Sequence, residues 1–133
     1  MIGVDIVEIA RIEKALKLQG FLTRMFTEAE REYLMERGFP SQTVAGMFCA
    51  KEAVAKALGT GLSHGVAICD IEVLHNEDNM PAIHLYHGAA ARAEELGLGE
   101  IQVSISHEKN YAVAVCLGVK KSGRKKKAEP KPL

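Results

Sequence analysis

The stretch that decides the fold is "FCAKEAVAKALGTG", residues 48–61. Small and apolar residues dominate it and Gly59 follows them, which predicts a buried helix that ends at this glycine. Three charged residues interrupt the apolar sequence: Lys51, Glu52 and Lys56. Because an unpaired charge is strongly disfavoured on a buried helix face, each of these side chains needs a partner from elsewhere in the molecule or from a ligand.

Glu52 and Lys56 are four residues apart, so on a helix their directions differ by only about 40°. Two explanations for the Glu52 carboxylate follow from this spacing. In the first, which spacing alone favours, Glu52 forms an i,i+4 ion pair with Lys56. In the second, Glu52 binds a divalent cation and Lys56 meets an anionic ligand.

The turn Gly59-Thr60-Gly61 has two possible roles. Gly59 ends the helix as an ordinary C-terminal glycine. The turn also has the composition of an anion-binding nest of backbone N–H groups. Since the macrodipole at a helix C-terminus repels phosphate, an anion there needs a compensating cation, and Lys56 lies one turn earlier.

Alternating apolar residues in "MIGVDIV", residues 1–7, predict a strand. Asp5 faces away from the isoleucines of this strand, on the side of Gly3, whose missing side chain leaves room for a ligand or another segment. Asp5 either caps the helix that follows or supplies a second carboxylate for Mg²⁺. That ion commonly takes one or two protein carboxylates, with water and phosphate oxygens completing its octahedron.

The remaining patterns predict an α+β domain, with helices on one side of a mainly antiparallel sheet. Thr27 and Glu30 have the spacing of a capping box, and Pro40 and Ser41 introduce the central helix. The short loop 107–110 predicts a closing hairpin. The expected helices are 8–20, 27–38, 41–59 and 88–97, and the expected strands are 1–7, 66–74, 82–87, 101–106 and 111–118.

Composition favours a soluble cytoplasmic protein. The chain has 133 residues, 47% hydrophobic and 26% charged, which suits one globular domain with a single core. No apolar run approaches the roughly 20 residues of a membrane span, and the N-terminus lacks the pattern of a secretion signal. The three cysteines lie far apart in apolar stretches, which is typical of reduced core residues.

The net charge of zero hides an asymmetry. Seven basic residues and one acidic residue lie in 120–133, so the rest of the chain carries a net charge of −6. We therefore expect a folded domain at 1–118 and a basic, disordered tail at 119–133. The tail is a solubilising extension, or it attracts an acidic protein, nucleic acid or an anionic surface. A nucleic-acid-binding role fits poorly with the acidic domain and its 5% aromatic content.

Two segments resemble a known family. "GVDIVEIARI" (3–12) and "FCAKEAVAKALGTG" (48–61) are similar to the paired signatures of holo-(acyl-carrier-protein) synthases, the small bacterial type of 4′-phosphopantetheinyl transferase. "VSISHEKNYAVA" (103–114) resembles the last hairpin of that family. The resemblance covers about residues 1–118 and leaves out the basic tail.

The resemblance implies the 4′-phosphopantetheinyl transferase fold and a Mg²⁺-dependent activity. The 4′-phosphopantetheine arm of coenzyme A would be transferred to a serine of apo-acyl carrier protein, with release of adenosine 3′,5′-bisphosphate, in support of fatty acid biosynthesis. Asp5 and Glu52 would bind the metal, and Glu52 and Lys56 would be catalytic. The residues implied in coenzyme A binding are Lys56, Gly59, Thr60, Gly61 and His107.

The resemblance also implies a homotrimer that binds coenzyme A in clefts between subunits. Arg11 and Arg24 would contact the carrier protein. Met47 stands where relatives often have an arginine, so a contact to phosphate is absent or comes from elsewhere. The serine proton would pass to Glu52 or to a water held by the metal. The alternative is a protein that binds coenzyme A without transferring its arm.

Overall fold

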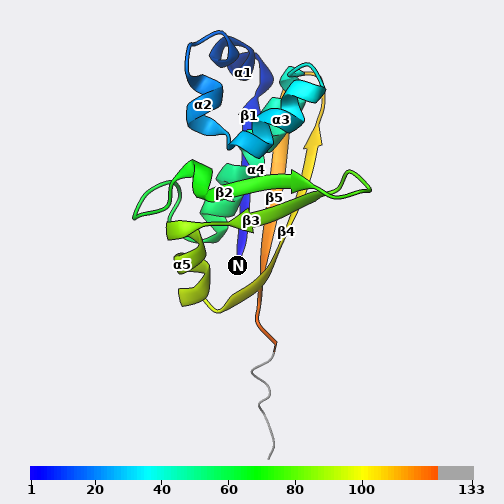
Figure 1. The fold of residues 1–133 in the computed structure, drawn as a ribbon. Coiled ribbons are helices and arrows are strands. Elements are labelled where there is room, and N and C mark those ends of the chain that lie inside the picture. The colour runs from blue at the N-terminus through cyan, green and yellow to red at the C-terminus, as the bar shows by residue number, and fades with distance from the viewer. Residues whose placement is uncertain (123–133) are drawn as a thin grey trace, which may run out of the picture.

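The structure is a computed structural model and describes residues 1–122. Four helices follow the first strand, and the longest of them, α4, runs through the middle of the molecule (Figure 1). The elements are β1 (Ile2–Glu8), α1 (Ile9–Leu16), α2 (Phe21–Met25), α3 (Glu28–Glu36), α4 (Ser41–Ala57), the 3₁₀ turn η1 (Ile68–Asp70), β2 (Ile71–His75), β3 (Pro81–Leu85), α5 (His87–Glu95), β4 (Leu98–His107) and β5 (Tyr111–Lys120).

The strands form two antiparallel sheets, one of three strands in the order β1-β5-β4 and one of two strands, β2-β3. Helix α4 contacts all three strands of the larger sheet and also β2. The expected α+β class with antiparallel pairing is confirmed. The single expected sheet is wrong, because β2 and β3 pair only with each other.

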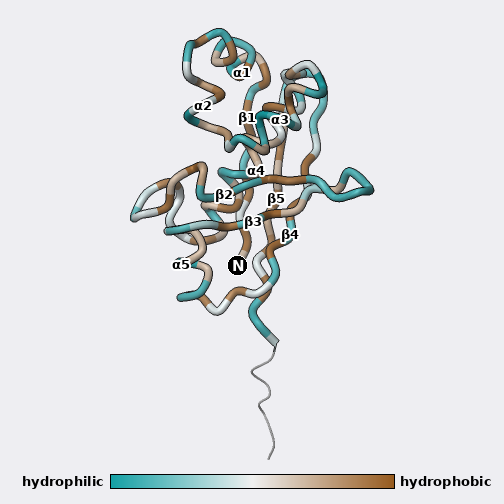
Figure 2. The backbone as a smooth tube through the Cα atoms, in the orientation of Figure 1, coloured by the Kyte–Doolittle hydropathy of each residue, from teal (hydrophilic) through white to brown (hydrophobic). Residues whose placement is uncertain are grey.

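The core is built around α4, whose buried residues are mostly small. Alanines and Cys49 of α4 pack against Ala112, Ala114 and Cys116 of β5, all fully buried. Larger side chains from the segments before α4 complete the core, including Phe26 and Leu34. Figure 2 shows hydrophobic stretches along the strands that cross the middle of the molecule. Small residues at this contact let the helix backbone approach the sheet closely.

Helix boundaries follow the sequence signals where those are local. Thr27 begins α3 with the expected capping box, since its hydroxyl accepts from Glu30 N and Glu30 accepts from Thr27 N. Gly59 follows the last residues of α4 with φ of 79°, a conformation that suits glycine. The predicted end of the central helix is therefore confirmed.

Several elements and boundaries differ from the prediction, among them the end of α1 at Leu16 and the start of β4 at Leu98. Helix α2 was not expected, and β2 begins at Ile71 because Ile68–Asp70 form the 3₁₀ turn. Strand β5 continues to Lys120, past the expected end of the domain. The rest of the expected tail, 123–133, lies outside the described residues. Within residues 1–122, no helix combines the length and apolarity that a bilayer crossing requires.

Candidate active site

Strand β1 lies directly on the backbone of α4 at Gly3. A Cβ added to Gly3 would lie 2.1 Å from Ala53 O and 2.6 Å from Ala57 N, far inside van der Waals contact. The missing side chain of Gly3 thus makes room for another segment of the chain, one of the two possibilities that the sequence left open. Glycine at this position brings the side chains of β1 within reach of the last turns of α4.

Asp5 lies on the same face of β1 and points toward α4. Its Oδ1 accepts a hydrogen bond from Lys56 Nζ at 2.9 Å, and the Cys49 thiol donates to its Oδ2 at 3.5 Å. The Asp5 side chain is only 15% exposed. The alternative in which Asp5 caps α1 is wrong, since the N-cap residue of α1 is Glu8 and no side chain caps that end.

Glu52 opens into the same surface pocket as Asp5, a hollow of about 350 Å³. Partial burial raises the pKa of Glu52, the negative charge of Asp5 raises it further, and Lys56 opposes the shift. Lys56 forms its ion pair with Asp5, not with Glu52, so the i,i+4 pair that spacing favoured is wrong. Two carboxylates from distant segments therefore face one pocket, with one ammonium group beside them.

Lys51 has a different partner. Its ammonium group is fully buried and forms an ion pair with the equally buried Glu30 of α3. Glu30 also accepts from the backbone N–H groups of Thr27 and Val73, so three segments donate to this single carboxylate. This pair accounts for the charge of Lys51 in a buried helix and keeps it out of the pocket that contains Glu52.

The Cys49 thiol is fully buried and contacts Asp5. Burial, followed by the charge of Asp5, raises the pKa of Cys49 to about 12. Since only the thiolate attacks or binds metal, a thiol with this pKa stays protonated near neutral pH. Cys49 serves as a neutral hydrogen-bond donor to the Asp5 carboxylate.

The turn after α4 has already committed two of its backbone donors. Gly59 N donates to Lys56 O at 3.0 Å, and Gly61 N donates to Ala55 O at 3.1 Å. The side chain of Thr60 donates to the Gly61 carbonyl. The N–H groups of both glycines thus satisfy carbonyls at the end of α4 and are not free to form the anion-binding nest. That the turn lies beside a ligand stays a prediction.

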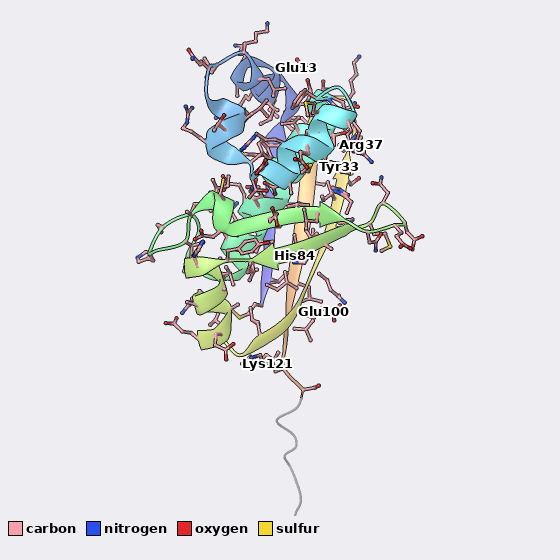
Figure 3. All side chains as sticks on the ribbon, viewed as in Figure 1. Glu13, Tyr33, Arg37, His84, Glu100 and Lys121 are labelled. Carbon is pink, nitrogen blue, oxygen red and sulfur yellow. The ribbon has the colours of Figure 1, made fainter. Side chains whose placement is uncertain are left out.

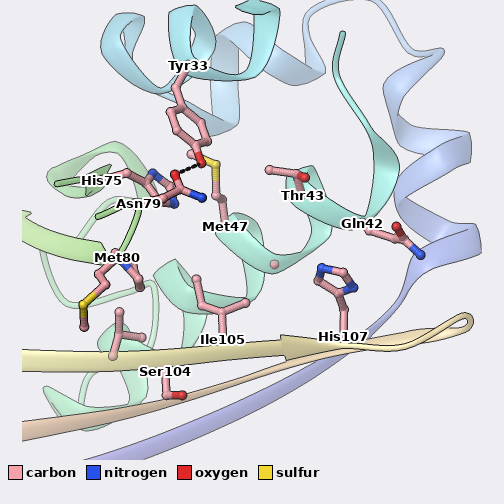
Figure 4. Close-up of a pocket in the computed structure, with 13 residues that line it drawn as sticks. Tyr33, Gln42, Thr43, Met47, His75, Asn79, Met80, Ser104, Ile105 and His107 are labelled. Atoms are coloured by element: carbon pink, nitrogen blue, oxygen red, sulfur yellow. Dashed lines mark hydrogen bonds between the residues drawn. The ribbon is translucent and has the colours of Figure 1, made fainter. Parts of the chain in front are cut away.

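His107 lines a different pocket from Asp5 and Glu52, also of about 350 Å³. Figure 4 shows His107 on β4 beside Gln42, with Met47 farther along the cavity wall. The Met47 side chain is 1% exposed and supplies only apolar surface at the place of the family arginine.

Two of the residues that line the pocket of His107, Tyr33 and His75, belong to a stack of three side chains. The Tyr33 and His75 rings stack with centroids 4.0 Å apart, and the Arg37 guanidinium lies 3.6 Å from the Tyr33 ring centroid. Figure 3 shows Tyr33 and Arg37 near each other, Tyr33 on α3 and Arg37 just past its C-terminal end. The Tyr33 hydroxyl donates to Asn79 Oδ1 at 2.9 Å. Aromatic and polar surface thus meet near the opening of this pocket.

The two arginines expected at the carrier-protein surface have different surroundings. Arg11 lines the pocket of Asp5 and Glu52. Arg24 is exposed on α2 and lies outside the lining of that pocket. The structure thus brings together Asp5, Glu52, Lys56 and Arg11, while His107, Gly59 and Thr60 line other hollows of the described surface.

Comparison with known proteins identifies the family. The family model of the 4′-phosphopantetheinyl transferase superfamily matches residues 1–116. The chain is 47% identical over 119 residues to a holo-(acyl-carrier-protein) synthase of Caldanaerobacter subterraneus subsp. tengcongensis, covering 89% of this chain and 93% of the relative. The relative from Caldicellulosiruptor bescii is 45% identical over 121 residues, covering 90% and 97%.

Solved structures agree with the sequence relatives. The Helicobacter pylori holo-(acyl-carrier-protein) synthase in complex with coenzyme A superposes with a TM-score of 0.77 at 34% identity, over 89% of this chain and 99% of that one. The Neisseria meningitidis enzyme gives a TM-score of 0.79 at 33% identity, over 90% and 97%. The chain therefore belongs to the holo-(acyl-carrier-protein) synthases of the 4′-phosphopantetheinyl transferase superfamily.

Proposed function

We propose that this chain transfers the 4′-phosphopantetheine group of coenzyme A to a serine of apo-acyl carrier protein, releasing adenosine 3′,5′-bisphosphate. The observation that carries the proposal is the convergence of Asp5 from β1 with Glu52 and Lys56 from α4. Their residue types suit phosphoryl transfer, in which positioning and charge stabilisation do most of the work. Membership of the holo-(acyl-carrier-protein) synthases supplies the substrate pair.

Asp5 and Glu52 fit a Mg²⁺ ion. Their carboxylates are hard oxygen donors, and the charge of Asp5 raises the pKa of Glu52, so the two repel each other in one pocket. A divalent cation between them would relieve that repulsion. When bound, the ion would supply Lewis-acid stabilisation of charge on the coenzyme A diphosphate. No group of three or more His, Cys, Asp or Glu side chains suited to a metal occurs in residues 1–122, so substrate and water oxygens would complete the shell.

The side chains of the site have separate tasks in this proposal. Lys56 keeps its charge, because its hydrogen bond to Asp5 raises its pKa, and its ammonium group stabilises negative charge on the transferred phosphate. Asp5 orients Lys56 through that bond. The serine proton passes to Glu52 or to a water held by the metal, both of which lie within this site in the proposal.

The active enzyme is a homotrimer in this proposal. The outer face of the larger sheet exposes large apolar side chains, among them Ile2 at 71% and Ile6 at 64%. A contiguous apolar surface of this kind is typical of an interface between subunits. His107 lines a pocket apart from Asp5 and Glu52, which agrees with coenzyme A bound between two subunits that contribute different residues.

The carrier protein docks beside the pocket of Asp5 and Glu52. Arg11 lines this pocket and Arg24 lies on the following helix, so both cations can meet an acidic protein that presents its serine. The product supports fatty acid biosynthesis in the cytoplasm. A basic tail that speeds this docking is a further part of the proposal, tested by removal of residues 120–133 at low salt.

The decisive experiment is the mass of apo-acyl carrier protein after incubation with the enzyme, coenzyme A and Mg²⁺. We expect the mass of the carrier protein to increase by one phosphopantetheine arm. No increase should occur in excess EDTA, and the increase should occur again when Mg²⁺ is restored. Binding of coenzyme A without any gain in carrier-protein mass would overturn the proposal and support the binding-only alternative.

A further inference from the structure

The C-terminal end of α4 presents a problem for any phosphate bound at the following turn. Backbone carbonyls at a helix C-terminus carry partial negative charge and repel an anion. Gly59 N and Gly61 N already donate hydrogen bonds to two of these carbonyls, so their N–H groups are not available to a ligand. The positive charge that such a ligand requires must therefore come from side chains.

Arg92 of α5 occupies this end of α4. Its Nε donates to Leu58 O at 2.9 Å, and Leu58 is the C-cap residue of α4. Its Nη1 donates to Glu95 Oε1 at 3.1 Å, an ion pair one turn along the same helix. The guanidinium is thus held at two of its nitrogens, one against the backbone end of α4 and one against a neighbouring carboxylate.

The third nitrogen of this guanidinium lies over the glycine turn. A Cβ added to Gly59 would stand 3.5 Å from Arg92 Nη2. Within residues 1–122 this nitrogen has no hydrogen-bond partner. Arg92 and Thr60 line one hollow of about 290 Å³, together with Gly59, His64 and Glu95. The Arg92 side chain is 33% exposed, so its charge is partly desolvated yet open to a ligand at this hollow.

We propose that Arg92 is a positioning residue for coenzyme A binding, and this rests on the function proposed above. Through Nε it holds the end of α4 and the Gly59-Thr60-Gly61 turn in place. Its fixed positive charge offsets the carbonyls of α4 and makes the turn receptive to a phosphate of coenzyme A. Lys56 then supplies positive charge at the pocket of Asp5, and Arg92 supplies it at the turn that follows α4.

Three variants test the role of Arg92. Arg92→Gln removes the charge and keeps a polar side chain, while Arg92→Lys keeps the charge and loses the planar fork. The matched control is Arg31→Gln, because Arg31 also donates to a backbone carbonyl at a helix end, Phe26 O, and is half-buried. Steady-state kinetics with varied coenzyme A, thermal unfolding, and calorimetric binding of adenosine 3′,5′-bisphosphate are measured for each.

We expect Arg92→Gln to raise the KM for coenzyme A about tenfold and to leave kcat within about twofold, because the positive charge that offsets the carbonyls at the end of α4 is lost. Arg92→Lys should recover part of the affinity, and Arg31→Gln should leave this KM unchanged even where it lowers Tm. Folded Arg92→Gln enzyme with a normal KM, or an equal rise in Arg31→Gln, would overturn the inference.

The function itself is tested separately. Wild-type enzyme that fails to modify the carrier protein would overturn the proposed transferase activity, whereas active wild-type enzyme with an unaltered Arg92→Gln variant would overturn only the role of Arg92. Binding of adenosine 3′,5′-bisphosphate needs no turnover, so weaker and less salt-sensitive binding by Arg92→Gln distinguishes an electrostatic role from a structural one.

Discussion

The two faces of the three-stranded sheet differ in the size of their side chains, and the larger ones lie on the exposed face. The inner face, against α4, carries the small residues of β1 and β5, and the outer face carries the large apolar ones. Gly3, Ala112, Ala114 and Cys116 are buried on the inner face. Ile2, Val4, Ile6, Val115 and Leu117 are 41–71% exposed on the outer face.

This difference shows that a buried position in this sheet does not require a large apolar side chain. The inner face must let the backbone of α4 come close enough for Asp5 to reach Lys56, and only small neighbours permit that approach. The outer face has no such limit, so large side chains there can be covered by another subunit. One face builds the proposed catalytic pocket and the other builds the proposed subunit interface.

The largest expected effect comes from Glu52, the carboxylate of α4 that is proposed to be catalytic. Glu52→Gln should lower turnover by about 10³-fold, because it removes a charge that the metal and the transferred proton both need. The fold should stay intact, since the change is isosteric. Carrier-protein mass measures the activity and circular dichroism measures the fold. Glu36→Gln, at a carboxylate that is 75% exposed, is the control. Normal activity in Glu52→Gln would remove this residue from both roles.

The second largest effect is expected at Gly3, where β1 approaches the backbone of α4 closely. Gly3→Ala would place a Cβ 2.1 Å from Ala53 O, so β1 and α4 must separate. We expect a loss of about 1–3 kcal/mol in the free energy of unfolding and a fall of more than about tenfold in activity. Gly99→Ala is the matched control, since its Cβ would first meet the flexible Lys121 side chain at 3.3 Å. Equal behaviour of the two variants in urea unfolding and in transfer assays would contradict this view of the inner face.

One introduced charge on the outer face should disrupt the proposed subunit interface. Ile6→Glu should dissociate the proposed trimer into folded monomers, because Ile6 is already 64% exposed in the single chain and its replacement leaves no cavity there. Light scattering after size-exclusion chromatography measures the mass in solution. Met35→Glu, at an equally exposed apolar residue of α3, should leave the assembly unchanged. A wild-type protein that is monomeric at all concentrations would show that the outer face has another purpose.

The smallest effect compares adjacent residues of β5. Burial raises the pKa of Cys116 to about 11, so at pH 8 only about one thiol in a thousand is ionised. We expect Cys116 to resist iodoacetamide, whose target is the thiolate, and to react faster as the pH rises toward 11. A cysteine introduced by Val115→Cys, on the outer face, should react readily in dilute protein and slowly in the trimer. Peptide mass spectrometry in a Cys69→Ser background measures both rates, and rapid labelling of Cys116 at pH 8 would contradict the buried inner face.

Much of this architecture could be predicted from local sequence signals. The capping box at Thr27, the glycine at the end of α4 and the hairpin of β4 and β5 each depend on residues near one another in the chain. The resemblance in two motifs correctly predicted the family. Asp5 and Glu52 were expected to converge, and the structure places both at one pocket.

What could not be predicted depends on partners far apart in the chain. The spacing of Glu52 and Lys56 fits an ion pair, yet Asp5, from another element, takes the ammonium group. Alternation in β1 identified two faces but not which one α4 would cover. No sequence pattern pointed to Arg92, because its importance comes from lying against Leu58, 34 positions away.

The buried carboxylate of Glu30 has a consequence for folding. It accepts from Val73 N on β2, from Lys51 on α4 and from Thr27 N at the start of α3. A two-stranded sheet such as β2-β3 is only marginally stable by itself. Its detachment would remove the hydrogen bond from Val73 N to the buried ion pair of Glu30 and Lys51. The hairpin therefore opens only when the helices do, and the Val73 amide should exchange its hydrogen as slowly as the centre of α4.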